Sequence, residues 1–347
     1  MPENYTSIAN LWTPDIWIRG ANERMNTLPS LISSPIVKRV PEFDALAEGG
    51  GITVNIPYFR DITDQADASQ VEGVQPAMQN LTSGKQIAPI FNRESGLASS
   101  SLAASVSGSD PVANILSQIA MRRQKQRQVT LVNILRGIFG TTSAPNAATG
   151  ALYAVRNDVF LEAGANPASN QLVSPFVFID TLGKLGELAD TTIGGGILMH
   201  PLMRASLLKQ DQISFQHYSS QAGVEMETYK GYRVFVSNLL YRSGTGGGYV
   251  FDTYIFAPGV FAWGEKPQVD GAQKADAASM RVWVNPQLNV EEIYDRTRFL
   301  LHPNGLRWVG TPAGQSATNA ELATPGNWSL DYSTADRVGI VCLRSNG

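Results

Sequence analysis

SDPVANILSQIAMRRQKQRQVTLVNILRGIFG, residues 109–140, carries the signals of one unusually long helix. Ser109-Asp110-Pro111 combines capping side chains with a proline at the first helical position, which is how helices commonly begin. Gly140 then favours a helix end. The segment therefore predicts a helix over about 110–139, roughly 44 Å long at about 1.5 Å per residue.

The apolar residues of this predicted helix fall into two groups with a basic stretch between them. That basic stretch is MRRQKQRQ, residues 121–128, which has four bases and no acid. A helix that is apolar at both ends and polar on every side in the middle is not a simple core helix, so we expect each end to pack on different elements. The two groups are Val112, Ile115, Leu116 and Ile119, and Leu131, Val132, Ile134, Leu135, Ile138 and Phe139.

The segments before the helix predict an arm and a long hairpin. Prolines recur throughout residues 1–50, so we expect this segment to be irregular and to lie along another surface. ITVNIPYF (52–59) alternates apolar and polar residues as a half-buried strand does, and 86–91 is its predicted return strand. The connection, residues 61–84, is polar and has four acids and no base. A short helix is predicted over roughly 95–106.

Residues 143–284 predict a mixed α/β unit. Ser174-Pro175 and His200-Pro201 each resemble a helix start, and the second helix is expected to reach about Lys209. The expected strands of this unit are 197–199, a pair within 229–236, 249–256 and 259–263.

The remaining residues predict long extended segments. Residues 290–301 form one such run, which ends at the turn 302–305. We expect 306–309 to be its hairpin partner. The apolar segment 337–344 predicts a last strand.

Composition and motifs argue against an enzyme. The 347 residues are 43% hydrophobic and only 16% charged, with a net charge of −3, which suggests much surface buried against other chains and no bulk attraction to nucleic acid. Cys342 is the single cysteine, expected to be buried and inert, and the three histidines lack metal-ligand spacing. No phosphate loop, signal peptide or membrane span is recognised. We expect no catalytic, cofactor or metal site; the histidines are His200, His217 and His302.

Several segments, taken in order, resemble the major capsid protein of tailed bacteriophages. They cover nearly the whole chain: GGGITVNIPYFRDIT (49–63), GKQIAPIFNRESGLASSSLAASVSGSDPVANILSQIA (84–120), MHPLMRASLL (199–208), TYKGYRVFVS (228–237), RTRFLLHPNGLRWVG (296–310) and TNAELATPGNWSLDY (318–332). The resemblance implies an α+β fold with an N-terminal arm, an extended β-hairpin called the E-loop, a P-domain with a long spine helix, and a mixed α/β A-domain. The implied ranges are 1–50 for the arm, 51–93 for the E-loop, 94–142 for the first part of the P-domain, 143–284 for the A-domain and 285–347 for the second part of the P-domain.

The resemblance also implies a function and partners. We expect a structural subunit that assembles with itself into hexamers and pentamers, closing as an icosahedral shell around double-stranded DNA. The expected partners are a separate scaffolding protein, a portal and a decoration protein, with weak, non-specific contact to DNA and none to membrane. The expected location is the virion, after assembly in the host bacterial cytoplasm. An encapsulin-like nanocompartment with the same fold is the alternative.

Two charge patterns within this order suggest a contact between subunits. In this fold a neighbour's E-loop lies over the P-domain, so an acidic E-loop tip and a basic spine helix could meet. A solvated helix face and direct contact with DNA are the other interpretations of the basic stretch. The candidate contact pairs Asp61, Asp64, Asp67 and Glu72 with Arg122, Arg123, Lys125 and Arg127.

A covalent cross-link between subunits is not expected. Some shells of this family are locked by an isopeptide bond from an E-loop lysine. Residues 51–84 contain no lysine, and Lys85 is the first.

Overall fold

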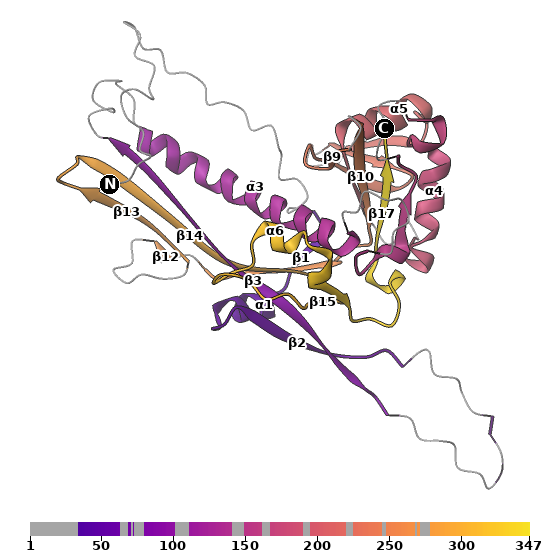
Figure 1. Ribbon diagram of the computed structural model, residues 1–347, viewed down its shortest axis with the longest axis horizontal. Coiled ribbons are helices and arrows are strands. Elements are labelled where there is room, and N and C mark those ends of the chain that lie inside the picture. Colours follow the sequence, from indigo (N-terminus) through magenta and orange to yellow (C-terminus); the bar gives the residue numbers. More distant parts are fainter. Residues whose placement is uncertain are drawn as a thin grey trace, which may run out of the picture.

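Figure 1 shows the computed structural model, in which helix α3 (Pro111–Phe139) lies along an elongated sheet. A compact mixed unit lies at the C-terminal end of α3, and a thin two-stranded ribbon projects away from the sheet. The structure describes residues 34–62, 69, 70, 72, 80–100, 111–140, 149–161, 167–189, 195–219, 225–244, 248–267, 269–270 and 278–347.

The elongated sheet is organised around β14 (Val290–Pro303), the long extended segment predicted from the sequence. β14 pairs antiparallel with β3 (Ser83–Ser100) over eleven residue pairs, and with β13 (Ser279–Asn285) on its other edge. The end of β14 pairs with β11 (Phe261–Glu265). The shorter strands are β1 (Val37–Arg39), β2 (Thr53–Phe59) and β12 (Val269–Asp270).

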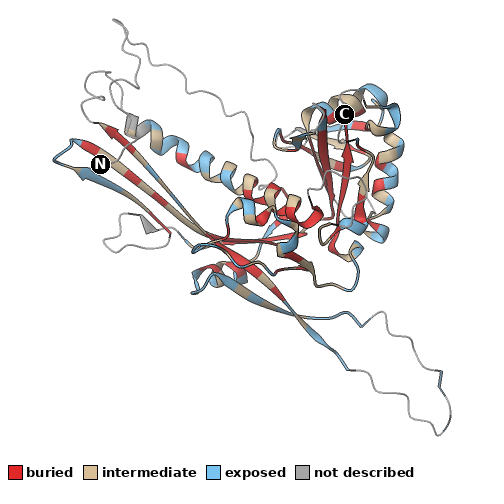
Figure 2. Cartoon of the chain, viewed as in Figure 1, coloured by how far each residue is buried: buried red, intermediate tan, exposed pale blue. Residues whose placement is uncertain are grey.

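Helix α3 has the start, end and length predicted from its sequence signals. Its C-terminal half is buried, with Leu131, Leu135 and Phe139 fully inaccessible, whereas its N-terminal half is largely exposed (Figure 2). The buried half packs on α6 (Asn319–Leu322) and the short helix η6 (Pro325–Asn327).

The mixed unit is an eight-stranded sheet with two helices whose starts the sequence predicted. Helix α4 (Pro175–Gly183) begins at Ser174, whose hydroxyl accepts a hydrogen bond from Val177 N, and α5 (Pro201–Gln210) begins at His200, whose Nδ1 accepts from Leu202 N. The strand order is β4-β17-β10-β5-β8-β7-β6, with β9 also on β10. The bounds are β4 Arg156–Asp158, β5 Gly196–Met199, β6 Phe215–Ser219, β7 Glu225–Tyr229, β8 Tyr232–Val236, β9 Tyr241–Ser243, β10 Tyr249–Phe256 and β17 Ile340–Ser345.

The strand pairing crosses the predicted domain ranges in two places. Strand β17 was grouped with the second part of the P-domain, but it lies inside the mixed unit between β10 and β4. Strands β11 and β13 come from the range assigned to the A-domain, yet they belong to the elongated sheet. Pairing between strands far apart in sequence therefore places parts of one predicted range in the sheet of another.

Two local predictions were wrong. Residues 95–100 continue β3 and are not helical, because β14 supplies a strand partner along this whole stretch. Residues 306–309 do not pair with β14: β15 (Leu306–Trp308) pairs with β16 (Trp328–Leu330), and the end of β14 is already paired with β11.

The end of the predicted irregular arm is also ordered. β1 pairs parallel with β11, and α1 (Pro41–Glu48) follows it with proline at its first position. Phe43 and Ala47 of α1 are buried, and Phe43 packs in a small core with Ala262 and Leu300. Residues 34–48 thus pack on the chain's own sheet, and residues 1–33 lie outside the described part of the chain.

Buried arginines join α3 to the mixed unit. Arg344 of β17 pairs with Asp252 (Nε to Oδ1, 2.9 Å) and also donates to the carbonyl of Gly140. Arg156 of β4 donates to the carbonyl of Phe139. Cations at the carbonyl end of a helix satisfy its last acceptors and oppose its dipole. This junction fixes the direction in which α3 leaves the mixed unit.

Candidate functional site

The histidines and the cysteine that were considered as catalytic residues include a helix cap and buried side chains. His200 caps α5, and His302 is fully buried with Nε2 2.8 Å from the carbonyl oxygen of Leu306. Cys342 is buried in β17, and burial raises the pKa of its thiol well above the usual value. Within the described ranges, no group of three or more His, Cys, Asp or Glu residues is placed to hold a metal ion. Among those same residues, no helix has the length and apolarity needed to cross a membrane.

The basic stretch lies where α3 passes over the elongated sheet, and Arg123 points toward that sheet. Its Nε donates to both carboxylate oxygens of Asp295 on β14, each at 3.1 Å, and Nη2 also donates to Oδ1. The side chains of Arg123 and Asp295 are 21% and 6% exposed. A two-pronged guanidinium–carboxylate pair of this kind fixes both position and direction. Arg123 therefore fastens α3 to β14 of the same chain.

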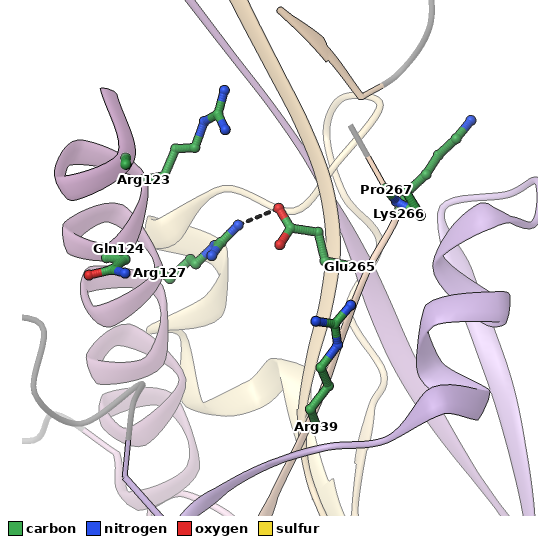
Figure 3. Close-up of a pocket in the computed structure, with 8 residues that line it drawn as sticks. Arg39, Arg123, Gln124, Arg127, Glu265, Lys266 and Pro267 are labelled. Carbon is green, nitrogen blue, oxygen red and sulfur yellow. Dashed lines mark hydrogen bonds and ion pairs between the residues drawn. The ribbon is translucent and has the colours of Figure 1, made fainter. Parts of the chain in front are cut away.

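Arg127 makes a second inward contact, one helical turn further along. Its Nη2 pairs with Oε1 of Glu265 on β11 (Figure 3), and its guanidinium carbon lies 4.5 Å from the ring centre of Trp263. Burial lowers the pKa of Arg127 below its ordinary value, and the charge of Glu265 opposes that effect. A cation held by both a carboxylate and an aromatic face is strongly positioned. Arg127 is thus also used within the chain.

A pocket of about 320 Å³ lies beside these two arginines (Figure 3). Three of the four cations that line it have acids close by: Arg123 pairs with Asp295, Arg127 pairs with Glu265, and Arg39 lies 3.2 Å from Asp44; the fourth cation is Lys266. The pocket is consequently not a strongly cationic hollow. It is lined by Arg39, Ala120, Arg123, Gln124, Arg127, Glu265, Lys266 and Pro267.

Arg122 and Lys125 are placed differently from Arg123 and Arg127. Arg122 is exposed, and its Nη1 donates to the neutral hydroxyl of Ser95 on β3. Lys125 is half-buried on the same helix. Of the four predicted contact bases, these two are the ones without an acid partner in the ion pairs and hydrogen bonds of the described residues.

The acidic residues predicted to meet the basic stretch are described only in part. Asp61, two residues beyond the end of β2, lies 3.3 Å from Arg337 of the same chain. Glu72 is exposed, and Asp64 and Asp67 lie outside the described residues. The predicted contact between subunits stays a prediction.

The ribbon formed by β2 and β3 is held near the outer end of its paired strands by residues that were not singled out in the sequence. Tyr58 OH donates to the carbonyl oxygen of Asp331 at 3.0 Å, and its ring packs edge-on against Tyr332, with centres 5.6 Å apart. Gly84 permits this arrangement, because a Cβ there would lie 2.6 Å from the Tyr58 ring. Gly84, the second residue of β3, is the sequence signal that could have pointed to this close approach.

Beyond Tyr58 and Gly84, the ribbon exposes large apolar side chains. Phe59 is 75% exposed, and Ile62 and Leu81 are each 56% exposed. Strand β2 pairs with β3 alone among the described strands. A two-stranded ribbon is at best marginally stable by itself, so this arrangement is suited to lying on another molecule.

Comparisons with known proteins show which proteins this chain is similar to in sequence and in fold. The sequence is 28% identical over 336 residues to the major capsid protein of Bacillus phage SPP1, covering 94% of each chain. No protein-family model matches the chain. The capsid protein of Ralstonia phage GP4 superposes with a TM-score of 0.61 at 10% identity, covering 96% of both chains. A Synechococcus elongatus encapsulin in its holo complex gives 0.52 at 10% identity, covering 95% of this chain and 92% of that one.

These similarities confirm the fold predicted from the sequence. The order of ribbon, long helix, mixed unit and long strands is that of the tailed-phage major capsid fold. The two solved structures are too distant in sequence to carry more than this fold.

Proposed function

We propose that this chain, a phage major capsid protein by fold and by its similarity to the SPP1 protein, assembles with copies of itself into hexamers and pentamers of an icosahedral shell around double-stranded DNA. The observation that carries the proposal is the ribbon of β2 and β3, which exposes Phe59, Ile62 and Leu81. Neighbouring copies supply the surface that the ribbon lacks. Assembly would place the protein in the virion, formed in the host bacterial cytoplasm.

Electron microscopy of the purified chain tests this function. We expect closed particles tens of nanometres across, either from the chain alone or after co-expression with a scaffolding protein. Co-expression is included as a condition because the proposed partners include a separate scaffold, in addition to a portal and a decoration protein. A monomer under all these conditions would contradict a shell function.

Within the shell, we propose that the acidic residues near the ribbon tip meet the basic stretch of a neighbour. The part of that stretch available for this contact is Arg122 and Lys125, because Arg123 and Arg127 have acid partners in their own chain. Charge complementarity of this kind sets the register and the partner more than the affinity.

A charge-reversal series tests that contact. Changing Arg122 and Lys125 to Glu should reduce assembly, and changing Asp64, Asp67 and Glu72 to Lys in the same chain should restore it. Arg123 and Arg127 are left unchanged, since reversing them would break the pairs with Asp295 and Glu265 and confuse assembly with folding. Unrestored assembly in a folded protein would leave the solvated-face and DNA interpretations.

Salt dependence separates these two interpretations. A few phosphate contacts from the basic stretch would be weak and strongly salt-sensitive. The Arg122 and Lys125 variants should then bind DNA fragments with a smaller salt slope than wild type. If the slope is unchanged, this part of α3 is a solvated face.

The similarity to an encapsulin favours a protein nanocompartment as the second candidate function. The contents of particles isolated from the native source distinguish the two. Packaged DNA is expected for a phage shell, whereas a protein cargo without DNA would favour the nanocompartment.

A further inference from the structure

Helix α4 is apolar on two opposite sides. Phe178 faces inward, fully buried, with its ring edge-on to Tyr229 at 4.9 Å between centres. Phe176 and Ile179 face outward and are 80% and 50% exposed. Large apolar side chains exposed together on a helix whose opposite side is already buried are typical of a surface that binds a partner. Among the described residues, the chain buries the Phe178 side of α4 and leaves the Phe176 side open to a partner.

The outward side of α4 also has a definite charge. Asp180, next to Ile179 in α4, and Glu187, on the short helix η4 (Gly186–Ala189) that contacts α4, are both exposed. The nearby base, Lys184, points inward, because its Nζ donates to the carbonyl oxygen of Arg156 at 2.5 Å. We call the surface of Phe176, Ile179, Asp180 and Glu187 the α4 patch: apolar, flanked by carboxylate acceptors.

A second exposed surface on the same unit has complementary chemistry. Tyr241 of β9 and Tyr249 of β10 are 47% and 55% exposed, with ring centres 6.1 Å apart. The ring of Phe251, which is buried, is centred 6.4 Å from that of Tyr249. The half-buried ring of His200 is centred 4.9 Å from that of Phe251 and 5.9 Å from that of Tyr241. We call these four residues the aromatic strip. Its rings support one another, which makes it a rigid platform.

The edge of the strip carries donors. Tyrosine hydroxyls can donate to carboxylates, and Arg136 of α3 donates to the carbonyls of Leu239 and Tyr241, which holds a positive charge next to the strip. Aromatic residues and arginine are the groups enriched at the energetic centres of protein interfaces. The strip therefore offers what the α4 patch lacks: hydroxyl donors and a cation.

The two surfaces lie apart on the mixed unit. In Figure 1, β9 is on the side that faces α3, whereas α4 is on the side that faces away from it. One copy cannot bring its own patch and strip together. Two different, complementary surfaces on separate sides of one chain generate a head-to-tail contact, which closes into a ring when the rotation between copies closes.

We propose that the α4 patch of one copy packs on the aromatic strip of the next copy, so that the mixed units form a ring by head-to-tail contact. This inference rests on the proposed shell function and names the residues of one contact within each hexamer or pentamer. Phe176 and Ile179 pack against the exposed tyrosine rings. Asp180 and Glu187 accept hydrogen bonds from the tyrosine hydroxyls and face Arg136.

Cross-linking between cysteines placed beside the two surfaces tests the contact. Gly183 extends the α4 patch by one turn and has open space around its Cα, and Ser243 is exposed and pairs with Tyr249. The variant Gly183→Cys/Ser243→Cys keeps both surfaces intact, and buried Cys342 does not interfere. After assembly, treatment with a short bis-maleimide and denaturation, we expect a ladder that continues past the dimer to the ring size.

The single variants are the matched controls. Gly183→Cys alone and Ser243→Cys alone should remain monomeric on the gel. Dimers from Gly183→Cys alone would mean that α4 meets α4, which overturns the head-to-tail contact. Assembled particles without a ladder in the double variant would overturn this inference and leave the shell function standing. A wild-type chain that never assembles would overturn the shell function itself.

Truncating an anchor gives an independent measurement. Phe176→Ser should weaken ring formation about tenfold or more, as loss of an interface anchor does, while the unassembled subunit keeps its circular dichroism spectrum. Ile213→Ser is the control, because Ile213 is 91% exposed on the same unit but belongs to neither surface. Equal effects of the two variants would contradict the proposed contact.

Discussion

Arg123 of α3 and Asp295 of β14 form a two-pronged ion pair, although 172 residues separate them in the sequence. The pair holds the exposed half of α3 against the sheet, where few apolar side chains are available to do so. Its carboxylate is almost fully buried. Part of the basic stretch therefore positions the long helix on the sheet.

Breaking the Arg123–Asp295 pair should lower the free energy of unfolding more than removing the neighbouring Arg122 side chain does. Asp295→Ala leaves a partly buried guanidinium without its carboxylate, and we expect the free energy of unfolding to fall by roughly 2–3 kcal/mol. Arg122→Ala is the matched control and should change it by less than about 0.5 kcal/mol, since Arg122 is exposed and bonded to a neutral hydroxyl. Urea unfolding of unassembled subunits measures both, and equal effects would argue against this role.

Gly137 should respond to alanine in the opposite sense to a normal helical glycine. Alanine usually stabilises a helix by up to about 1 kcal/mol relative to glycine. At Gly137, however, a Cβ would collide with the carbonyl oxygen of Leu322 and lie 2.6 Å from Nε1 of Trp328. That nitrogen donates to Leu322 O at 2.8 Å, so the substitution pushes α3 away from a buried hydrogen bond. We expect Gly137→Ala to cost about 2 kcal/mol by urea unfolding.

Gly183 of α4 provides the control for this prediction. A Cβ at Gly183 meets nothing within 4 Å, so Gly183→Ala should raise the free energy of unfolding by about 0.5 kcal/mol. If both substitutions stabilise the subunit, the close packing of α3 against α6 and Trp328 is not as described.

The features that could be predicted from the sequence are those with local causes. Helix α3 has a start signal, an end signal and a periodic pattern within one segment, and its bounds were predicted within a residue or two. The starts of α4 and α5 could also be predicted from the sequence, because the capping residue and the proline are adjacent. The resemblance in motif order then supplied the fold, which no single segment specifies.

The errors have distant causes. Residues 95–100 were predicted to be helical, but they pair with β14 as a strand. The turn at 302–305 suggested a hairpin, yet β11 already occupies the end of β14. The inward direction of Arg123 and Arg127 depends likewise on acids far along the chain. A charge pattern shows that bases are present, but not which face they occupy.

Particles of this protein should contain no covalent links between subunits. Residues 51–84 lack lysine, and the first lysine after them, Lys85, lies on β3 in register with Pro57 of β2. Boiled particles should therefore run as a single band near 37.5 kDa on a denaturing gel. Bands at multiples of that mass, persisting with a reducing agent, would contradict this expectation.

The buried His302 should make the subunit less stable in mild acid. Burial lowers the pKa of His302 from 6.5 to about 4, because the charged ring would lose its water. Its Nε2 already meets the carbonyl oxygen of Leu306, and Nδ1 has no hydrogen-bond partner among the described residues. Protonation would therefore place a charge on a nitrogen with no acceptor, close to the ring of Trp328.

The direction of the effect follows from which state holds the proton. Above about pH 6.5 neither state binds it, so His302 contributes nothing to the pH dependence. Between about pH 6.5 and about pH 4 the unfolded state binds the proton and the folded state does not, so the free energy of unfolding falls as the pH falls. At about 1.4 kcal/mol per pH unit, the loss approaches about 3 kcal/mol at pH 4. Comparing urea unfolding of wild type and His302→Gln at pH 7 and pH 5 isolates this contribution: the variant should lose about 2 kcal/mol less than wild type over that interval, and parallel losses would show that other groups cause the acid sensitivity.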